Sequence, residues 1–426
     1  MRYGLKNARL PIKLSRQKYY SADGTASVVV PRPIKLTRFV LAVVLSALAV
    51  PLLIMNAIKN DPNLAEKWSV NIAQPFERVA GTLTSWLPVS VFELCVVCLI
   101  IAGVFLFVRL VINLCCARFK RILTGILALG TAAVFVLNLY TLSMGFGYYR
   151  KPMPLAAAGE EYKLENVVDA AEYFLADYNA LAEKFERDEN GCVICPYSVR
   201  ELSELLKREY DKLDGDYFYS YTPTAKPITN SWFLSDVLIT GITFLPTGEP
   251  NVNIAAPPST VAATMAHELA HTKGVQREGD ANLISYYVLL ASDNDYLRYC
   301  GYYETFSDFT GALTLPTDDL DEFLRIRKEV SPLVSAEHSY AFSYWIKQPD
   351  LMGKIGEFFN NLYLIFAGAS NGTGSYDDGN KSDVVTPSDP ITGEPEIDPD
   401  TQKPVRIPVY SDLQKIYFYL YEKRTA

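Results

Sequence analysis

Three long apolar runs occupy the first third of the chain and form its strongest pattern. Residues 39–58 contain no charged side chain, residues 89–108 contain only Glu93, and residues 122–146 contain none. A helix of roughly 20 apolar residues is long enough to cross the hydrocarbon core of a bilayer. None of these runs has the amphipathic period of a half-buried helix in a soluble protein. The pattern therefore predicts three transmembrane helices within residues 39–148.

The region that follows alternates between helical and strand-like patterns. Apolar residues recur at helical spacing over residues 162–187, and Ser198–Leu213 forms a second amphipathic segment. Ser198 and Glu201 have the spacing of a capping box, which marks a helix start. Short β-like runs follow at Val237–Leu245 and Val252–Ile254. Helical patterns return from Thr260, and a final helix is expected over Asp412–Tyr421.

These elements predict an α+β fold: three N-terminal transmembrane helices, then a mostly helical domain with a small sheet. The expected organisation is a tail over residues 1–38, a membrane region over 39–148 and an outer domain over 149–426. Residues 370–408 are rich in Asp, Gly, Ser and Pro and are expected to form a loop insertion.

The distribution of charge predicts how the chain is oriented. Residues 1–38 carry nine Lys/Arg and one acid, and the connection 115–121 carries three Lys/Arg. The connection between the first two apolar runs balances its bases with acids. Because Lys and Arg are enriched in cytoplasmic loops, we expect a cell-membrane protein with a cytoplasmic N-terminus and an extracytoplasmic C-terminal domain.

Composition narrows the class of partner. The chain is 49% apolar and 21% charged, which excludes a disordered or collagenous protein. Its net charge is −8, and the residues after the basic tail carry −16, so nucleic acid is not an expected partner. The lipid bilayer, in contrast, is an expected partner.

Cys192 and Cys195 could form a disulfide or half of a metal site, but no second Cys-x-x-Cys exists to complete a zinc knuckle.

The sharpest chemical signal is His267-Glu268-x-x-His271, which uses two of only three histidines. Residues four apart share one face of a helix, so both imidazoles can reach one metal ion. A catalytic zinc takes three protein ligands and leaves a fourth position to water. Glu268 is placed to act on that water as the general base.

The third ligand is expected just after a turn at Gly274, since glycine readily adopts the left-handed conformation that ends a helix. Glu278 and Asp280 both lie at the start of the next predicted helix. Glu278 is preferred because Asn282, four residues on, can then bind the free ring nitrogen of a histidine ligand. Asp280 stays open as the rival ligand.

This segment resembles the zincin metallopeptidases, and its Glu278-x-x-Ala281-Asn282 is similar to the corresponding motif of gluzincins. The chain resembles more closely an uncharacterised bacterial family, the domain of unknown function thirty-eight ten, over most of residues 39–370. The matching segments are 246–253, 267–274, 278–282 and 298–302. The resemblance implies three membrane helices, an outer zincin-like domain and metal-dependent peptidase chemistry, without a substrate. Metzincins fit less well, since their third ligand would fall on Arg277.

The predicted function is a membrane-anchored zinc metalloendopeptidase that hydrolyses peptide bonds of a peptide or protein substrate outside the cytoplasm. Zn²⁺ is the expected cofactor, held by His267, His271 and Glu278. A further side chain should stabilise the oxyanion, and His338 is the predicted residue. Tyr340, Tyr376 and Tyr410 are the other candidates for this role.

Two further predictions stay open. An extended peptide substrate is expected to add to a strand edge near Val252–Ile254. The alternative function is a non-catalytic zincin-like sensor or peptide-binding membrane protein. A transporter is disfavoured because the apolar runs contain almost no charge, and an intramembrane protease because the metal motif lies outside them. The sequence leaves the substrate and the oligomeric state undetermined.

Overall fold

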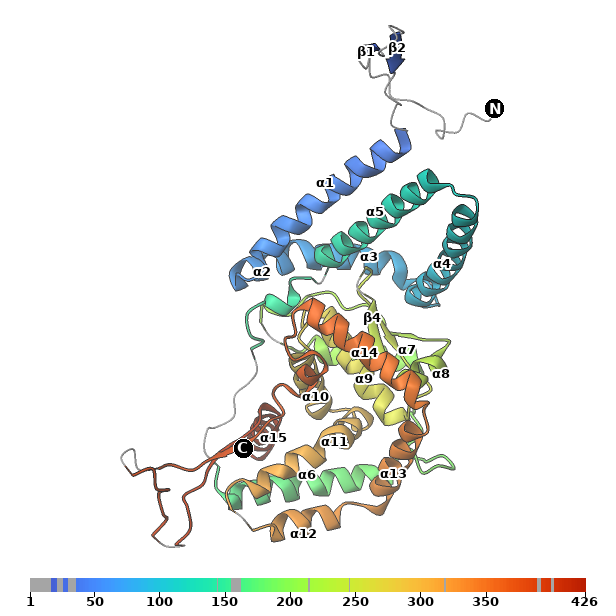
Figure 1. Cartoon of the computed structure of the whole chain (residues 1–426). Coiled ribbons are helices and arrows are strands. Elements are labelled where there is room, and N and C mark those ends of the chain that lie inside the picture. Colours follow the sequence, from blue (N-terminus) through green and yellow to red (C-terminus); the bar gives the residue numbers. More distant parts are fainter. Residues whose placement is uncertain are drawn as a thin grey trace. The chain divides into compact units, whose positions relative to one another are not determined.

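The computed structural model describes residues 17–20, 26–29, 36–143, 145–154, 162–213, 215–244, 246–317, 319–388, 392–399 and 402–426 (Figure 1). Most of the expected basic tail lies outside these residues, as does Leu245 of an expected strand. Within the tail, β1 (Gln17–Tyr20) pairs antiparallel with β2 (Ala26–Val29). The chain forms two compact units, one of residues 1–60 and 96–142, the other of residues 61–95 and 143–426.

The first unit contains long apolar helices. They are α1 (Leu36–Ile58), α5 (Phe119–Ser143) and α4 (Val91–Cys115), whose first turn belongs to the second unit. All three are long and apolar enough to cross a membrane, as the sequence predicted. Polar side chains join two of them, since Asn138 of α5 donates to the Leu48 carbonyl of α1 over 2.9 Å. The orientation of these helices stays a prediction.

The second unit begins between the apolar runs, where the sequence predicted only a connection. A short helix α2 (Pro62–Trp68) passes through the π-helical turn η2 (Ser69–Ala73) into α3 (Gln74–Ser85). The carboxylate of Asp61 caps α2 by accepting from the backbone N–H groups of Asn63 and Leu64. These helices are part of the second unit rather than a loop between membrane spans.

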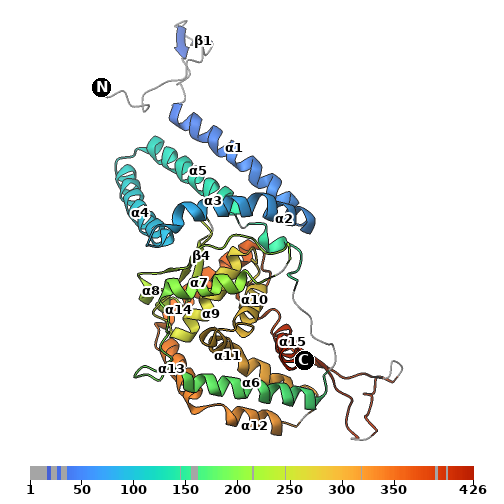
Figure 2. The ribbon, with the colours of Figure 1, turned by 180° about the vertical axis from the view of Figure 1, so that it is seen from behind.

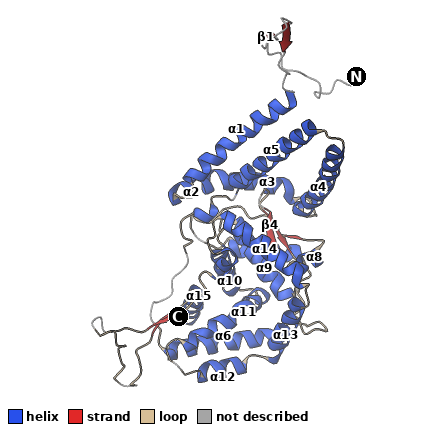
Figure 3. Cartoon of the chain, in the orientation of Figure 1, coloured by secondary structure: helices blue, strands red, loops and turns tan. Residues whose placement is uncertain are grey.

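Helices make up most of the second unit, as expected (Figure 3). The first two are α6 (Leu164–Lys184) and α7 (Val199–Tyr210). The predicted capping box of α7 is present, because Ser198 and Glu201 bond to each other's backbone N–H. Later helices are α8 (Ser231–Asp236), α9 (Pro258–Thr272), α10 (Glu278–Leu290), α11 (Asp295–Thr310), α12 (Asp321–Glu329), α13 (Pro332–Ile346), α14 (Asp350–Ala367) and α15 (Asp412–Thr425).

Helices α9, α10 and α11 pack on one another at the core of this unit. Helices α6 and α15 cover α11 from the other side, and Figure 2 shows this layer from behind. Aromatic rings fill the space between the layers: Phe309 stacks on Tyr417 at 4.0 Å, and Phe174 meets the edge of the same ring. This packing makes α9 a rigid support for its side chains.

The sheet has three strands in the order β3 (Lys226–Pro227), β5 (Glu249–Val252), β4 (Gly241–Phe244). The prediction of a strand over residues 237–245 is therefore too long. Residues 237–240 instead end α8 in a turn, because Leu238 takes the left-handed conformation (φ +57°) and the N–H of Ile239 donates to the Leu234 carbonyl. The second strand starts earlier than predicted, at Glu249. It is central, so a substrate cannot add to its edge as expected, and β4 is the edge strand beside it.

The predicted loop at 370–408 contains short elements. They are the 3₁₀ helix η5 (Gly372–Asp377) and the hairpin of β6 (Asp383–Val385) with β7 (Ile407–Val409). Residues 389–391 and 400–401 of this stretch lie outside the described residues. The other 3₁₀ segments are η3 (Gly147–Tyr149) and η4 (Gly311–Thr314).

Candidate metal centre

The two candidate metal helices meet at a tight turn. Helix α9 ends at Thr272, and Gly274 follows with φ +84°, the left-handed conformation predicted for it. A side chain at Gly274 would also collide with Arg150 and Tyr219. The buried Arg150 donates to the Gly274 carbonyl over 2.8 Å and forms an ion pair with Glu66. The turn is thus fixed from outside, and α10 starts at Glu278 in a defined place.

His267, His271 and Glu278 converge at this turn. Their candidate ligand atoms all lie within 4.8 Å of one another. Oε2 of Glu278 is 3.1 Å from Nε2 of His267 and 3.5 Å from Nε2 of His271. The two rings stand perpendicular, with centroids 4.7 Å apart. Two imidazoles and one carboxylate are the ligand set of a catalytic zinc site.

Hydrogen bonds orient both rings toward this point. Nδ1 of His267 lies 2.7 Å from Oδ1 of Asn282, and Nδ1 of His271 lies 2.8 Å from the carbonyl of Val275. Because both partners accept, Nδ1 of each ring carries a hydrogen, and Nε2 of each ring is turned toward Glu278. A metal ion at this point would take the lone pair of each Nε2 and an oxygen of Glu278 as its ligands. The residues therefore fit a divalent metal ion.

The charges at this point favour a cation, either a metal ion or a proton on His271. Burial lowers the pKa of His271, but the Glu278 carboxylate outweighs it and raises that pKa to about 9. Burial raises the pKa of Glu278, but the charges and hydrogen bonds of the two histidines hold it well below its usual range. Glu278 is thus an anion in a buried position, which suits a metal ligand.

Glu268 is buried beside the three ligands. Burial raises its pKa, while the nearby histidines act in the opposite direction. The hydroxyl of Thr243 on β4 donates to its Oε2 over 2.6 Å. Gly241, at the start of the same strand, has no room for a side chain because one would collide with this carboxylate. The edge strand thus lies directly against Glu268.

The rival ligand Asp280 points elsewhere. It lies two residues past Glu278, and its Oδ2 is 3.7 Å from a guanidinium nitrogen of Arg277. The structure groups Glu278, not Asp280, with the two histidines. Arg277 itself donates to the backbone carbonyls of Tyr148 and Arg150, so it supports the site without contacting the ligands.

Two tyrosines reach the cluster from distant parts of the chain. Tyr148 of η3 donates its hydroxyl to Oε1 of Glu278 over 2.8 Å. The ring of Tyr376 in η5 lies 6.2 Å from the His267 ring, and its backbone carbonyl accepts from Asn282. Burial and the charges of Glu278 and Glu268 raise the pKa of Tyr376 well above its ordinary value. Tyr376 was one of four predicted candidates, whereas Tyr148 was missed.

The other candidates lie outside this group. His338 of α13 stacks on Tyr303 with ring centroids 4.1 Å apart. Its neighbour Glu337 binds Ser259 at the start of α9, eight residues or about 12 Å from His267 along the helix. Tyr340 also lies on α13, and Tyr410 donates to the Tyr162 carbonyl in the α15 layer. No contact in the described residues joins these three side chains to the metal ligands.

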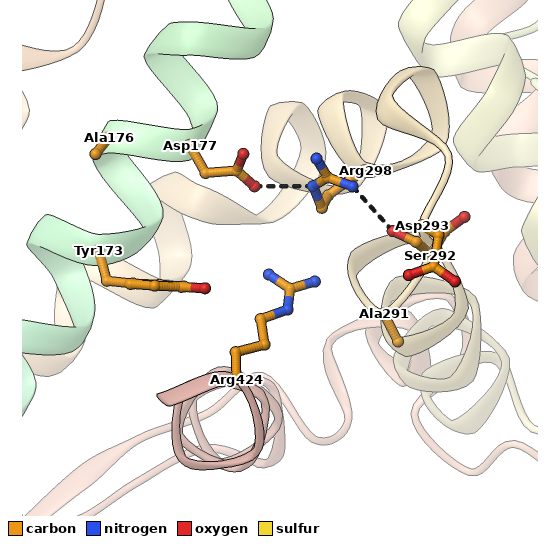
Figure 4. Close-up of a pocket in the computed structure, with 8 residues that line it drawn as sticks. All are labelled: Tyr173, Ala176, Asp177, Ala291, Ser292, Asp293, Arg298 and Arg424. Atoms are coloured by element: carbon orange, nitrogen blue, oxygen red, sulfur yellow. Dashed lines mark hydrogen bonds and ion pairs between the residues drawn. The ribbon is translucent and has the colours of Figure 1, made fainter. Parts of the chain in front are cut away.

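A pocket beside α6 and α15 contains charged residues, none of which is among the three candidate metal ligands (Figure 4). Its lining comes from α6, from the turn between α10 and α11, from α11 and from α15. Arg298 donates to Asp177 over 2.8 Å, and the Tyr302 hydroxyl binds the same carboxylate. These residues of the sequence motif at 298–302 therefore join α11 to α6. Cys192, Cys195 and Cys300 are all free thiols, so the disulfide that the sequence allowed between Cys192 and Cys195 is not formed.

Comparison with known proteins gives a single assignment. No curated protein and no solved structure matches the chain. A family model described as "Protein of unknown function (DUF3810)" matches residues 68–379. The match begins after α1, later than the resemblance suggested. It includes α4, α5, the three candidate ligands and Tyr376. Since it spans well over half of the sequence, the chain belongs to this family of proteins of unknown function.

Proposed function

We propose that the protein is a membrane-anchored zinc metallopeptidase that hydrolyses peptide bonds outside the cytoplasm. The observation that carries this proposal is the convergence of His267, His271 and Glu278 within 4.8 Å. Beside them lies the buried carboxylate of Glu268. A purely structural metal site has no need of an additional buried acid. The resemblance of this segment to zincins agrees with the same reading.

The chemistry follows from the roles of the residues. A zinc ion held by the three ligands would lower the pKa of its bound water toward 7 and polarise the scissile carbonyl. Glu268 takes a proton from the attacking water as the new C–O bond forms, and passes a proton to the nitrogen as the C–N bond breaks. Its raised pKa suits both transfers. Tyr376, whose raised pKa keeps its hydroxyl protonated, would donate to the oxyanion.

The edge strand offers a place for the substrate. β4 pairs with β5 on one side, and its Gly241 and Thr243 lie against Glu268. An extended peptide that pairs with the other side of β4 would run past the catalytic carboxylate. The proposed substrate site is therefore the free edge of β4, in place of the strand edge near Val252–Ile254 that the sequence suggested.

The activity is tested with the full-length chain in detergent or liposomes. Cleavage of a mixed peptide library is compared between wild type and Glu268→Gln, with Glu172→Gln as the surface control. We expect Glu268→Gln to keep its zinc and to lose cleavage by about 10²- to 10⁴-fold, the usual contribution of a general base. Bound zinc with no cleavage by either wild type or Glu268→Gln would reject the enzyme and favour the non-catalytic sensor.

The extracytoplasmic location needs its own experiment. Cys192 and Cys300 are buried, so they are poor targets for a labelling reagent. Lys328 of α12 is exposed, and Lys328→Cys adds an accessible thiol. An impermeant maleimide applied to whole cells should label this variant above the wild-type level. Labelling that appears only after lysis would reverse the proposed orientation.

A further inference from the structure

Helix α14 leaves most of its large apolar side chains exposed. Six large apolar residues on it are each at least half exposed, from 52% for Ile365 to 70% for Leu351. At 100° per residue they fall on one side of the helix, and no charged residue lies among them. The six are Leu351, Phe358, Phe359, Leu362, Ile365 and Phe366. A soluble helix usually turns such a face inward.

The opposite face of α14 is small and polar, and it is the face that packs inward. Gly353 and Gly356 approach Leu238 and the Val237 carbonyl so closely that a side chain at either glycine would collide. One turn further, Asn360 hydrogen-bonds to Tyr376 at the metal cluster. Asn361 accepts from the Thr373 N–H of η5 over 3.1 Å. The helix is thus held in this orientation along its length, and its apolar face is fixed outward.

The C-terminal end of α14 lies next to the point where the chain leaves a membrane-length helix. Gly368, directly after α14, packs so tightly on Tyr149 that a side chain there would lie 2.8 Å from the tyrosine hydroxyl. Tyr149 follows the end of α5 at Ser143 by six residues, a reach of at most about 20 Å. All of these residues belong to the second unit, so the distance along the chain places this end of α14 near the bilayer.

The other end of the apolar surface is tied to the start of α4. Glu93, in the first turn of α4, accepts from the backbone N–H groups of Thr229 and Asn230 over 2.9 Å each. Helix α8 follows at once and exposes Trp232 and Phe233. Leu238, also exposed, touches Gly353 of α14 and connects the two helices. The apolar surface therefore extends between the first turn of α4 and the end of α5.

From this placement we infer that α14 is an in-plane membrane helix, whose face of Leu351, Phe358, Phe359, Leu362, Ile365 and Phe366 inserts into the lipid interface. An amphipathic helix with an apolar face and polar borders binds a bilayer in this way. The charged residues of α14, Asp350, Lys354 and Glu357, all lie on one border between the two faces, where headgroups and water can solvate them. The exposed Trp232 suits the same interface. The inference holds whether or not the metal centre is catalytic.

The test uses the full-length chain in phosphatidylcholine and phosphatidylglycerol liposomes. A photoreactive benzoylphenylalanine replaces Phe358 or Phe366, a change that keeps an aromatic side chain. Phe107 of α4 serves as the lipid-facing control, and the partly exposed Tyr173 of α6 as the water-facing control. Cross-linked products are identified by mass spectrometry.

We expect lipid adducts at positions 358 and 366 at yields close to those at 107, with few or none at 173. Cross-links from 358 or 366 to a second copy would assign the face to a dimer, and cross-links to α1, α4 or α5 would assign it to the chain's own helices. Either result would overturn the inference, as would lipid adducts no more frequent than at position 173.

Discussion

Asn282 accepts a hydrogen bond from His267 at the candidate metal centre, with Oδ1 2.7 Å from Nδ1. It lies one turn beyond Glu278 on the same face of α10, so one helix supplies both a ligand and the residue that orients another ligand. Its amide nitrogen donates to the Tyr376 carbonyl over 2.9 Å, which joins η5 to the same point. Asn282 therefore connects the two metal helices and the loop that bears Tyr376.

Replacement of Asn282 should weaken metal binding without removing a ligand. We expect Asn282→Ala to lower zinc affinity by about 10- to 100-fold, the usual effect of losing a residue that orients a histidine ligand. Asn282→Asp keeps the oxygen that accepts from His267 but loses the donor to the Tyr376 carbonyl, so its affinity should fall between those of Asn282→Ala and wild type. Competition with a chromogenic chelator measures both. Equal affinity in Asn282→Ala and wild type would show that the hydrogen bond does not orient the ring for a metal.

The tyrosine hydroxyl at the cluster should matter more than the third histidine. Tyr376→Phe removes the proposed donor to the oxyanion, so kcat should fall by about 10²-fold with little change in KM or zinc content. His338→Phe can still stack on Tyr303 and should cleave at the wild-type rate. Steady-state kinetics of the two variants are compared on a peptide that the wild type cleaves in the library experiment. A large loss in His338→Phe alone would return the role to His338.

The enclosed carboxyl group of Glu304 on α11 should make stability depend on pH. Burial raises its pKa to about 7, although Thr260 hydrogen-bonds to it, and its Oε1 has no hydrogen-bond partner. A carboxyl group whose folded pKa exceeds its unfolded value favours the folded state less as pH rises from about 4.5 to 7. The loss is at most about 3 kcal/mol at 1.36 kcal/mol per pKa unit.

Glu304→Gln has no such titration, so it should gain stability relative to wild type between pH 5 and pH 8. Thermal unfolding midpoints of the full chain in detergent measure this, with the surface variant Glu172→Gln as control. The idea fails if the difference between Glu304→Gln and wild type is the same at both pH values.

Arg150 should stabilise the turn between the metal helices. Its guanidinium is buried and binds Glu66 twice, the Gly274 carbonyl and the Tyr217 carbonyl. Arg150→Met leaves those groups unpaired and should cost about 3 kcal/mol of stability. Arg150→Lys keeps the charge but not the forked geometry and should fall between the two. Thermal unfolding in detergent ranks the three proteins, and a Met variant as stable as wild type would contradict this account.

The sequence predicted the parts of the structure that depend on local pattern. Three membrane-length helices, the capping box at Ser198 and the glycine turn at Gly274 all follow from residue spacing, and the structure confirms them. His267, His271 and Glu278 lie within 12 residues, so two adjoining helices can bring them together. That they hold zinc stays a prediction.

Tertiary packing decides what the sequence could not predict. Tyr148 lies 130 residues from Glu278, in a short 3₁₀ turn that has no periodic pattern. Tyr376 lies in a segment whose composition resembles a loop. The apolar run at residues 237–240 was interpreted as strand because so short an apolar run does not distinguish a strand from the end of a helix. Pattern alone also gives no sign that α14 turns its apolar face outward.

The most direct test of the account is the metal content of the purified full-length chain. The protein is freed of metal with a chelator, reloaded with zinc and dialysed. The zinc bound per chain is then measured by inductively coupled plasma mass spectrometry. We predict one zinc per chain in wild type, Glu268→Gln and Asp280→Asn, and loss of that zinc in His267→Ala, His271→Ala and Glu278→Ala. Wild type without zinc, or His271→Ala with a full equivalent, would contradict the metal centre; loss in Asp280→Asn but not in Glu278→Ala would reassign its third ligand.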